Sequence, residues 1–183
     1  MNPPDISAET PLVSVVVVNF NCKQWLDQFF PSLRAQTIFD RVEVILVDNS
    51  SKDGSAETCE RIMADWSNGV FVRTGGNYGF GGGSNRGAKV ARGEYLLFLN
   101  PDVRLEKNCL EELAVQAARN CVEVACPLVL DYDTDAVQTC GASGFDLFGQ
   151  PIPATLNETS DRRFSIGAFL FVLRTAFAKR VSF

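Results

Sequence analysis

Asparagine and aspartate side chains follow three apolar runs of this sequence, at the point where each run stops. Asn19 and Asn21 follow the first run, Asp48 follows the second, and Asn100 and Asp102 follow the third. Carboxylate and amide oxygens are the ligands that a hard divalent cation takes in proteins. Any one of these residues could instead cap the helix or turn that follows its strand. Three such groups together favour a ligand site, in which Asp48 and Asp102 are the strongest candidates.

Pro101 predicts where the third strand ends. A proline has no backbone N–H for a sheet ladder, and it biases the preceding Asn100 toward an extended conformation. Pairing therefore stops at the Asn100-Pro101-Asp102 segment. We expect the carboxylate of Asp102 to project beyond the sheet.

The glycine-rich segment 77–87, NYGFGGGSNRG, is the second candidate for ligand binding. Glycines without side chains let backbone approach a ligand, or let a segment move as a flap. A flexible linker is the alternative, but a linker would not need Tyr78 and Phe80. The segment matches only half of the dinucleotide fingerprint G-x-G-x-x-G, which also belongs after the first strand. We therefore disfavour a Rossmann dehydrogenase.

Composition excludes several classes of function. The net charge of −5 argues against a nucleic-acid partner, and the absence of histidine removes His-based nucleophiles and His-ligated zinc. The six cysteines form no C-x-x-C pair, which is typical of reduced core residues. No apolar run is long enough to span a bilayer. From these features we expect a cytoplasmic protein.

The elements that must position these side chains alternate between strand and helix. Apolar runs predict strands at 12–18, 42–47, 69–74 and 94–100, and a late strand that runs into a helix within 162–177. Helical periodicity lies between them, with Pro31 expected to kink or interrupt the first helix. This alternation predicts an α/β fold with a mostly parallel central sheet and helices on both faces. The carboxyl ends of its strands would form the ligand crevice.

Five segments in this order and spacing resemble family 2 glycosyltransferases of the GT-A fold. They are VSVVVVNFN, VEVILVDNSSKDGS, NYGFGGGSNRG, GEYLLFLNPDV and GAFLFVLRTAF. They are particularly similar to the rhamnosyltransferase branch of that family. The resemblance covers residues 11–183, which we interpret as one glycosyltransferase domain after an N-terminal tail at 1–10.

The resemblance implies transfer of a sugar, with inversion, from a UDP- or dTDP-sugar, such as dTDP-rhamnose, to a glycan or lipid-linked acceptor. It implies a role in polysaccharide biosynthesis. The family's D-x-D motif, which holds Mg²⁺ or Mn²⁺ on the donor diphosphate, falls on Asn100-Pro101-Asp102, with Asp102 as the metal ligand. The resemblance places the nucleotide-sugar site at Asn19, Phe20, Asn21, Asp48, Asn49, Gly81, Gly82, Asn85 and Asn100.

Two departures from the family pattern stand out. Asn100 replaces the first aspartate of D-x-D, which leaves one charged metal ligand. The family's acidic motif, which supplies the catalytic base, would lie beyond Phe183, so we assign no base and expect a truncated chain with the donor-binding portion only. Asp131 and Asp133 lie in what we interpret as a turn.

Two hypotheses for the chain stay open on the sequence. One is a glycosyltransferase or its donor half, and the other is a nucleotide-sugar-binding fragment without chemistry. Peripheral association with the inner face of the membrane and homo-oligomerisation are compatible with both.

Overall fold

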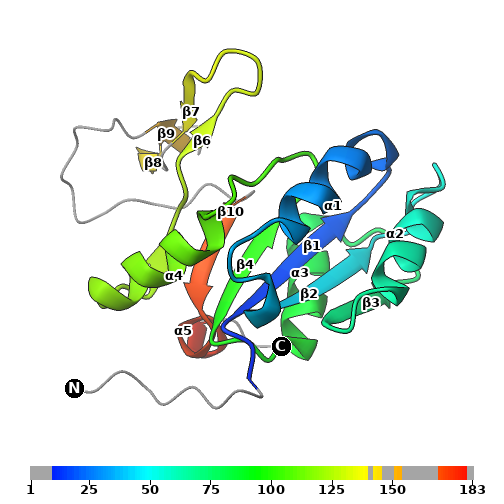
Figure 1. The fold of residues 1–183 in the computed structure, drawn as a ribbon, viewed down its shortest axis with the longest axis horizontal. Helices are drawn as coiled ribbons and strands as arrows, with labels where there is room; N and C mark the ends of the chain where they lie inside the picture. The colour runs from blue at the N-terminus through cyan, green and yellow to red at the C-terminus, as the bar shows by residue number, and fades with distance from the viewer. Residues whose placement is uncertain (1–9, 140–141, 146–150, 154–168, 181–183) are drawn as a thin grey trace.

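A computed structural model describes residues 10–139, 142–145, 151–153 and 169–180 (Figure 1). The expected tail at 1–10 and the chain end at Phe183 lie, except for residue 10, outside the described residues. A six-stranded sheet in the order β3-β2-β1-β4-β10-β5 forms its centre. The strands are β1 (Val13–Asn19), β2 (Val42–Asp48), β3 (Gly69–Arg73), β4 (Tyr95–Leu99), β5 (Val124–Ala125) and β10 (Phe169–Leu173).

The four N-terminal strands are parallel, as the alternating pattern predicted. β1 lies between β2 and β4, and every residue of these three strands is buried. β-Branched and aromatic residues dominate them, which suits strands covered on both faces. β10 then joins β4 in the antiparallel direction, so the sheet is mixed at that edge.

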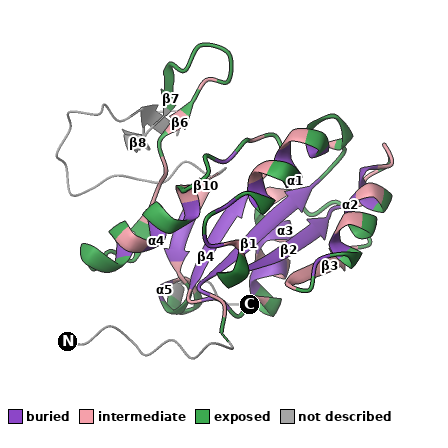
Figure 2. Ribbon diagram, viewed as in Figure 1, coloured by how far each residue is buried: buried purple, intermediate pink, exposed green. Residues whose placement is uncertain are grey.

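Helices cover both faces of the sheet, whose central strands are buried between them (Figure 2). Alternate residues along β1 belong to opposite layers. One layer packs α1 (Leu26–Arg34), α2 (Ser55–Ala64) and α4 (Cys109–Arg119) against the odd-numbered residues of β1. The other packs α3 (Gly79–Val90) and α5 (Arg174–Arg180) around Val16, Ile45 and Phe98. Short 3₁₀ turns, η1 (Lys23–Trp25) and η2 (Phe39–Arg41), complete this part of the chain.

Two predictions about helices need correction. Pro31 lies inside α1, which continues to Arg34 without interruption. The buried face of α1 (Leu26, Phe29, Phe30 and Leu33) packs into the core and offsets the one backbone hydrogen bond that proline cannot make. The glycine-rich segment, for which the sequence allows a flap or a linker, is mostly helical, because α3 begins at Gly79.

Two small hairpins follow α4, apart from the main sheet (Figure 1). They are formed by β6 (Val129–Leu130) with β7 (Val137–Thr139), and by β8 (Ala142–Phe145) with β9 (Pro151–Pro153). The predicted strand before the last helix is β10, which runs directly into α5. Within the described part of the chain, no helix has the length and apolarity needed to cross a bilayer.

Candidate functional site

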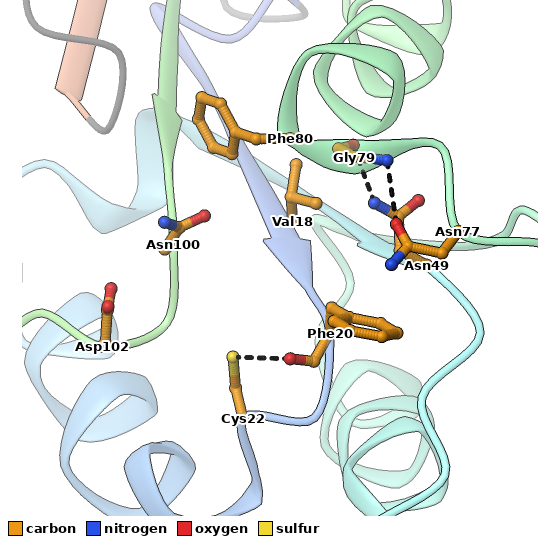
Figure 3. A pocket seen from close by; sticks show the side chains of 9 residues that line it. All are labelled: Val18, Phe20, Cys22, Asn49, Asn77, Gly79, Phe80, Asn100 and Asp102. Carbon is orange, nitrogen blue, oxygen red and sulfur yellow. Dashed lines mark hydrogen bonds between the residues drawn. The ribbon is translucent and has the colours of Figure 1, made fainter.

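The ends of β1, β2 and β4 meet at one edge of the sheet, as predicted. Asn19 lies level with Asp48 in the parallel register, and β4 ends on the other side of β1. A cleft of about 240 Å³ opens there (Figure 3). Its lining residues are Val18, Phe20, Cys22, Asn49, Asn77, Gly79, Phe80, Asn100 and Asp102.

Asp48 lies beneath this cleft and organises the chain around it. Asn19 Nδ2 lies 2.9 Å from Asp48 Oδ1, 2.9 Å from Ser51 Oγ and 3.0 Å from Ser55 Oγ. Asp48 Oδ2 accepts the backbone N–H groups of Ser50 and Ser51 at 3.2 and 3.3 Å. Asp48 is only 2% exposed. Its carboxylate therefore holds the loop after β2 rather than lining the cleft.

Asn49, the next residue, forms one wall of the cleft. Its Nδ2 donates to the carbonyl oxygen of Gly79 at 2.9 Å, which ties the loop after β2 to the start of α3. Its Oδ1 is buried and has no hydrogen-bond partner among the described residues. A buried acceptor without a donor is costly. Because this oxygen is closed to solvent, the Asn49 side chain would have to turn before the oxygen could accept a hydrogen bond from a ligand in the cleft.

Gly79 has a structural reason to be glycine. Its φ of +68° lies in the left-handed region, and its N–H donates to Asn77 Oδ1 at 2.9 Å. This turn brings Asn77 and Gly79 to the same wall as Asn49, as Figure 3 shows.

Asn100 and Asp102 form the opposite wall (Figure 3). Asn100 is half-buried, Asp102 is exposed, and Asp102 is the one carboxylate among the described residues that line the cleft. No cluster of three Cys, Asp or Glu side chains suited to a metal occurs in the described residues. Mg²⁺ is commonly held by one or two carboxylates together with substrate phosphates and water. Asp102 with the amide oxygen of Asn100 fits such a site, which a bound substrate would complete.

Apolar groups and a thiol lie between the two walls. Phe20 is 43% exposed, and its carbonyl oxygen accepts a hydrogen bond from Cys22 Sγ at 3.4 Å. Burial raises the pKa of the Cys22 thiol above its ordinary value of 9.0, and the negative charges of Asp102 and Asp53 raise it further. Cys22 is therefore a neutral thiol near pH 7, not an activated nucleophile.

The glycines of α3 serve packing more than ligand approach. A Cβ at Gly87 would lie 2.3 Å from Val16 Cγ1, and one at Gly83 would lie 2.8 Å from Val18 Cγ1. Because these two positions have no side chain, the backbone of α3 packs directly against the sheet. Arg86, beside them, stacks on Tyr78 at 3.5 Å and donates to the carbonyl oxygen of Gly82 at 3.0 Å.

The structure separates the candidate residues into groups. Phe20, Asn49, Asn100 and Asp102 line the cleft. Asn19 and Asp48 lie beneath it, and Asn21 Oδ1 accepts the N–H of Lys52 at 2.8 Å in the neighbouring loop. Gly81, Gly82 and Asn85 lie on α3 and are not among the residues that line the cleft.

Five lining residues are not among those that the sequence assigned to the site: Val18, Cys22, Asn77, Gly79 and Phe80. Three of them belong to the glycine-rich segment 77–87, whose ligand-binding role the sequence did predict as a whole. A signal for Asn77 was present, because an Asn two residues before a glycine is typical of a side-chain-stabilised turn.

Comparisons with known proteins agree on one family. The sequence model named "Glycosyl transferase family 2" matches residues 14–180. The glycosyltransferase GlyG of Streptococcus pneumoniae is 30% identical over 122 residues, which cover 67% of this chain and 40% of GlyG. EpsH of Bacillus subtilis, provisionally named a glycosyltransferase, is 31% identical over 138 residues, covering 72% of this chain and 40% of EpsH. The chain thus spans about two fifths of the length of these relatives.

Solved structures share the fold. TarS 1-349 of S. aureus, in complex with UDP, superposes with a TM-score of 0.70 at 21% identity over 92% of this chain and 48% of that one. The mannosyltransferase PcManGT of Pyrobaculum calidifontis, in complex with GDP-Man and Mn²⁺, gives 0.67 at 18% identity over 100% of this chain and 51% of that one. At these identities the likeness shows the fold, which is the GT-A fold expected from the sequence.

Proposed function

The chain belongs to glycosyltransferase family 2, and from that premise we propose that residues 11–183 form the donor-binding portion of a glycosyltransferase. The reaction would transfer a sugar from a nucleoside diphosphate to a glycan or lipid-linked acceptor, with inversion at the anomeric carbon. One observation carries the proposal. The cleft at the strand ends has an unpartnered buried acceptor, Asn49 Oδ1, on one wall and an exposed carboxylate, Asp102, on the other.

The nucleoside would occupy the side of the cleft near Asn49. The half-exposed ring of Phe20 offers an apolar surface for a flat base. Once the Asn49 side chain turns toward the cleft, its Oδ1 would accept the imide N–H of uracil or thymine, which favours UDP- or dTDP-sugars. UDP in the TarS complex supports this assignment, and the resemblance to the rhamnosyltransferase branch supports dTDP-rhamnose as donor. Asn19 and Asp48 would act from below, by holding the loop that carries Asn49.

The diphosphate would lie toward Asp102 and Asn100. None of the described residues that line the cleft is a lysine or arginine. A Mg²⁺ or Mn²⁺ ion bound there would offset the negative charge that develops on the leaving diphosphate. Asp102 would hold that ion through its exposed carboxylate and Asn100 would contribute its amide oxygen. The Mn²⁺ named in the PcManGT complex supports metal use by an enzyme of this fold.

The catalytic base is not assigned to any described residue. Asp131 Oδ1 accepts hydrogen bonds from the backbone of Asp133 and from both the N–H and the hydroxyl of Thr134. This is the turn expected from the sequence, and its carboxylate serves the turn.

Isothermal calorimetry of UDP and dTDP, with and without Mn²⁺, tests the donor site. The unaltered protein should bind at least one of them, and Mn²⁺ should tighten binding. Asp102→Asn should remove the tightening and leave metal-free binding unchanged, whereas Asp65→Asn, an exposed control at the end of α2, should change neither. Equal affinity with and without metal in the unaltered protein would contradict the role of Asp102. Release of UDP or dTDP from a sugar donor would then distinguish an enzyme from a binding fragment.

A further inference from the structure

Gln36, just after α1, connects two parts of the chain that lie far apart in sequence. It is only 4% exposed. Its Nε2 donates to the carbonyl oxygen of Glu106 at 2.8 Å and to that of Ser32 at 3.1 Å, and its Oε1 accepts the N–H of Leu110 at 3.1 Å. The side-chain amide therefore bridges the end of α1, the segment before α4 and the first turn of α4.

Neighbours of Gln36 hold the same segment. Ser32 Oγ accepts the N–H of Leu105 at 3.2 Å, and the N–H of Thr37 donates to the carbonyl oxygen of Lys107 at 3.0 Å. We call Ser32, Gln36 and Thr37 the α1 clamp. The clamp fixes three consecutive residues, 105–107, to the end of α1.

The clamped segment is the continuation of the chain that carries Asp102. β4 ends at Leu99, and Leu105 is again buried in the core at 7% exposure. Asn100 and Asp102 thus lie on residues 100–104, a short span between two fixed ends. Because so short a span has little slack, a shift at 105–107 would move the Asp102 carboxylate relative to the Asn49 wall.

We propose that Gln36 is a positioning residue for Asp102: its amide sets the far end of the span and so fixes where the carboxylate meets the donor diphosphate. The inference rests on the proposed role of Asp102 in donor binding. The competing hypothesis is a purely structural role, in which Gln36 caps α4. That hypothesis has some basis, because the helix's own N-cap, Asn108, makes no side-chain capping bond.

Two substitutions separate these hypotheses. Gln36→Glu keeps an acceptor for the Leu110 N–H, and so keeps the cap, and its ionised carboxylate cannot donate to the Glu106 carbonyl oxygen. Because burial favours the protonated form, which can donate, this variant is measured at two pH values. Gln36→Met removes both interactions at similar length. Asn68→Ala is the matched control, because Asn68 Nδ2 also bridges two carbonyl oxygens, those of Phe39 and Val42, away from Asp102.

UDP titrations at a series of Mn²⁺ concentrations give the first measurement. Both Gln36 variants should raise the Mn²⁺ concentration that gives half of the affinity gain, because a displaced Asp102 carboxylate would hold the ion less well. We expect a rise of about tenfold, the low end of the effect of changing groups that orient a metal ligand. Metal-free UDP affinity should stay unchanged. Asn68→Ala should leave the Mn²⁺ response unchanged, even if it lowers the melting temperature as much as the Gln36 variants do. A Gln36→Glu variant with the response of the unaltered protein would overturn the inference.

Hydrogen exchange of the metal-free protein gives the second measurement. Amides at 100–108 should exchange faster in both Gln36 variants than in the unaltered protein. In Asn68→Ala their exchange rates should stay unchanged. Unaltered exchange at 100–108 in the variants would also overturn the inference. If the unaltered protein shows no response to Mn²⁺, the metal role of Asp102 fails separately, and the exchange data still decide whether Gln36 fixes the span.

Discussion

At the scale of single residues, Asp48 and Asp102 illustrate how two carboxylates that follow different strands of one sheet take different tasks. Asp48 is buried and accepts hydrogen bonds from Asn19 and from two backbone N–H groups, while Asp102 stands exposed in the cleft. The first shapes the loop that carries Asn49, and the second meets the ligand in our proposal. Substitutions should therefore separate them in both stability and binding.

Asp48→Ala should weaken nucleoside diphosphate binding about ten- to hundredfold, with or without metal, because the Asn49 loop loses its anchor. It should also lower the free energy of unfolding by about 1–3 kcal/mol, since buried N–H donors lose their acceptor. Urea unfolding and calorimetry measure the two effects. A variant as stable as the unaltered protein would show that the loop keeps its shape without this carboxylate.

The hydrogen bonds that the Asp53 carboxylate accepts should make the stability of the protein depend on pH. Burial acts to raise the pKa of its carboxyl, but hydrogen bonds from the Ser55 hydroxyl and from the N–H groups of Lys23 and Ser55 outweigh it, so the pKa lies below the ordinary 3.8. A lowered pKa in the folded state means that the stability is complete above the ordinary value and is lost as pH falls through the lower one.

The melting temperature of Asp53→Asn should therefore lie below that of the unaltered protein at about pH 6, and the gap should narrow as the pH falls below about 4. Asp65→Asn, with an exposed side chain at the end of α2, is the control. A gap that stays constant over this range would mean that the hydrogen bonds to Asp53 do not depend on its charge.

At the scale of elements, the effect of replacing a glycine of α3 depends on whether that glycine faces the sheet. A Cβ at Gly81 would meet nothing within 4 Å, whereas one at Gly87 would clash with Val16 and approach Val47 Cγ2 at 3.1 Å. Gly81→Ala should raise the free energy of unfolding by about 0.5–1 kcal/mol through helix propensity. Gly87→Ala should lower it by about 1–3 kcal/mol through overpacking, despite the same gain in propensity. Equal effects in urea unfolding would refute this account of the helix.

The same helix shows where sequence reasoning reached its limit. The buried strands β1, β2 and β4 and their polar ends could be predicted, because uninterrupted runs of β-branched and aromatic residues are typical of strands covered on both faces. The start of α3 at Gly79 could not, because glycine is a poor helix former, and the contacts that hold the helix on the sheet are made later, by Gly83 with Val18 and by Gly87 with Val16. Nor could the sequence tell that Asn49, rather than Asp48, forms the cleft wall, since that depends on hydrogen bonds with Asn19 and Gly79.

Hydrogen exchange can locate any motion in the glycine-rich segment. With α3 helical from Gly79, we expect fast exchange without ligand to concentrate at 74–79 and to slow when UDP binds. This segment carries the Asn49–Gly79 hydrogen bond, so a ligand on Asn49 would stabilise both loops. Slow exchange at 74–79 in both states would show a rigid turn instead.

At the scale of the whole molecule, ligand binding should appear as thermal stabilisation. A nucleoside diphosphate at a hundred times its dissociation constant adds about 2.7 kcal/mol. For a domain of this size that corresponds to a rise in melting temperature of about 5–10 °C. Uridine or thymidine diphosphate with Mn²⁺ should give the largest rise in a thermal-shift series that also includes the adenosine, guanosine and cytidine forms. A series without any shift would argue against a nucleotide site in this chain.

The strand order also has a consequence for how the chain folds as it is made. β1 and β2 can pair early, but β1 pairs on its other side with β4, and β4 in turn pairs with β10, whose residues 169–173 come last among the strands of the main sheet. A ribosome that adds about 5–20 residues per second would leave the outer edge of β4 without a partner for several seconds. During that interval the apolar run Tyr95–Leu99 is an open template for strands of other nascent chains. Pairing of β10 with β4 thus ends the interval in which β4 can aggregate, which makes β4 the segment that a chaperone on the nascent chain would have to cover.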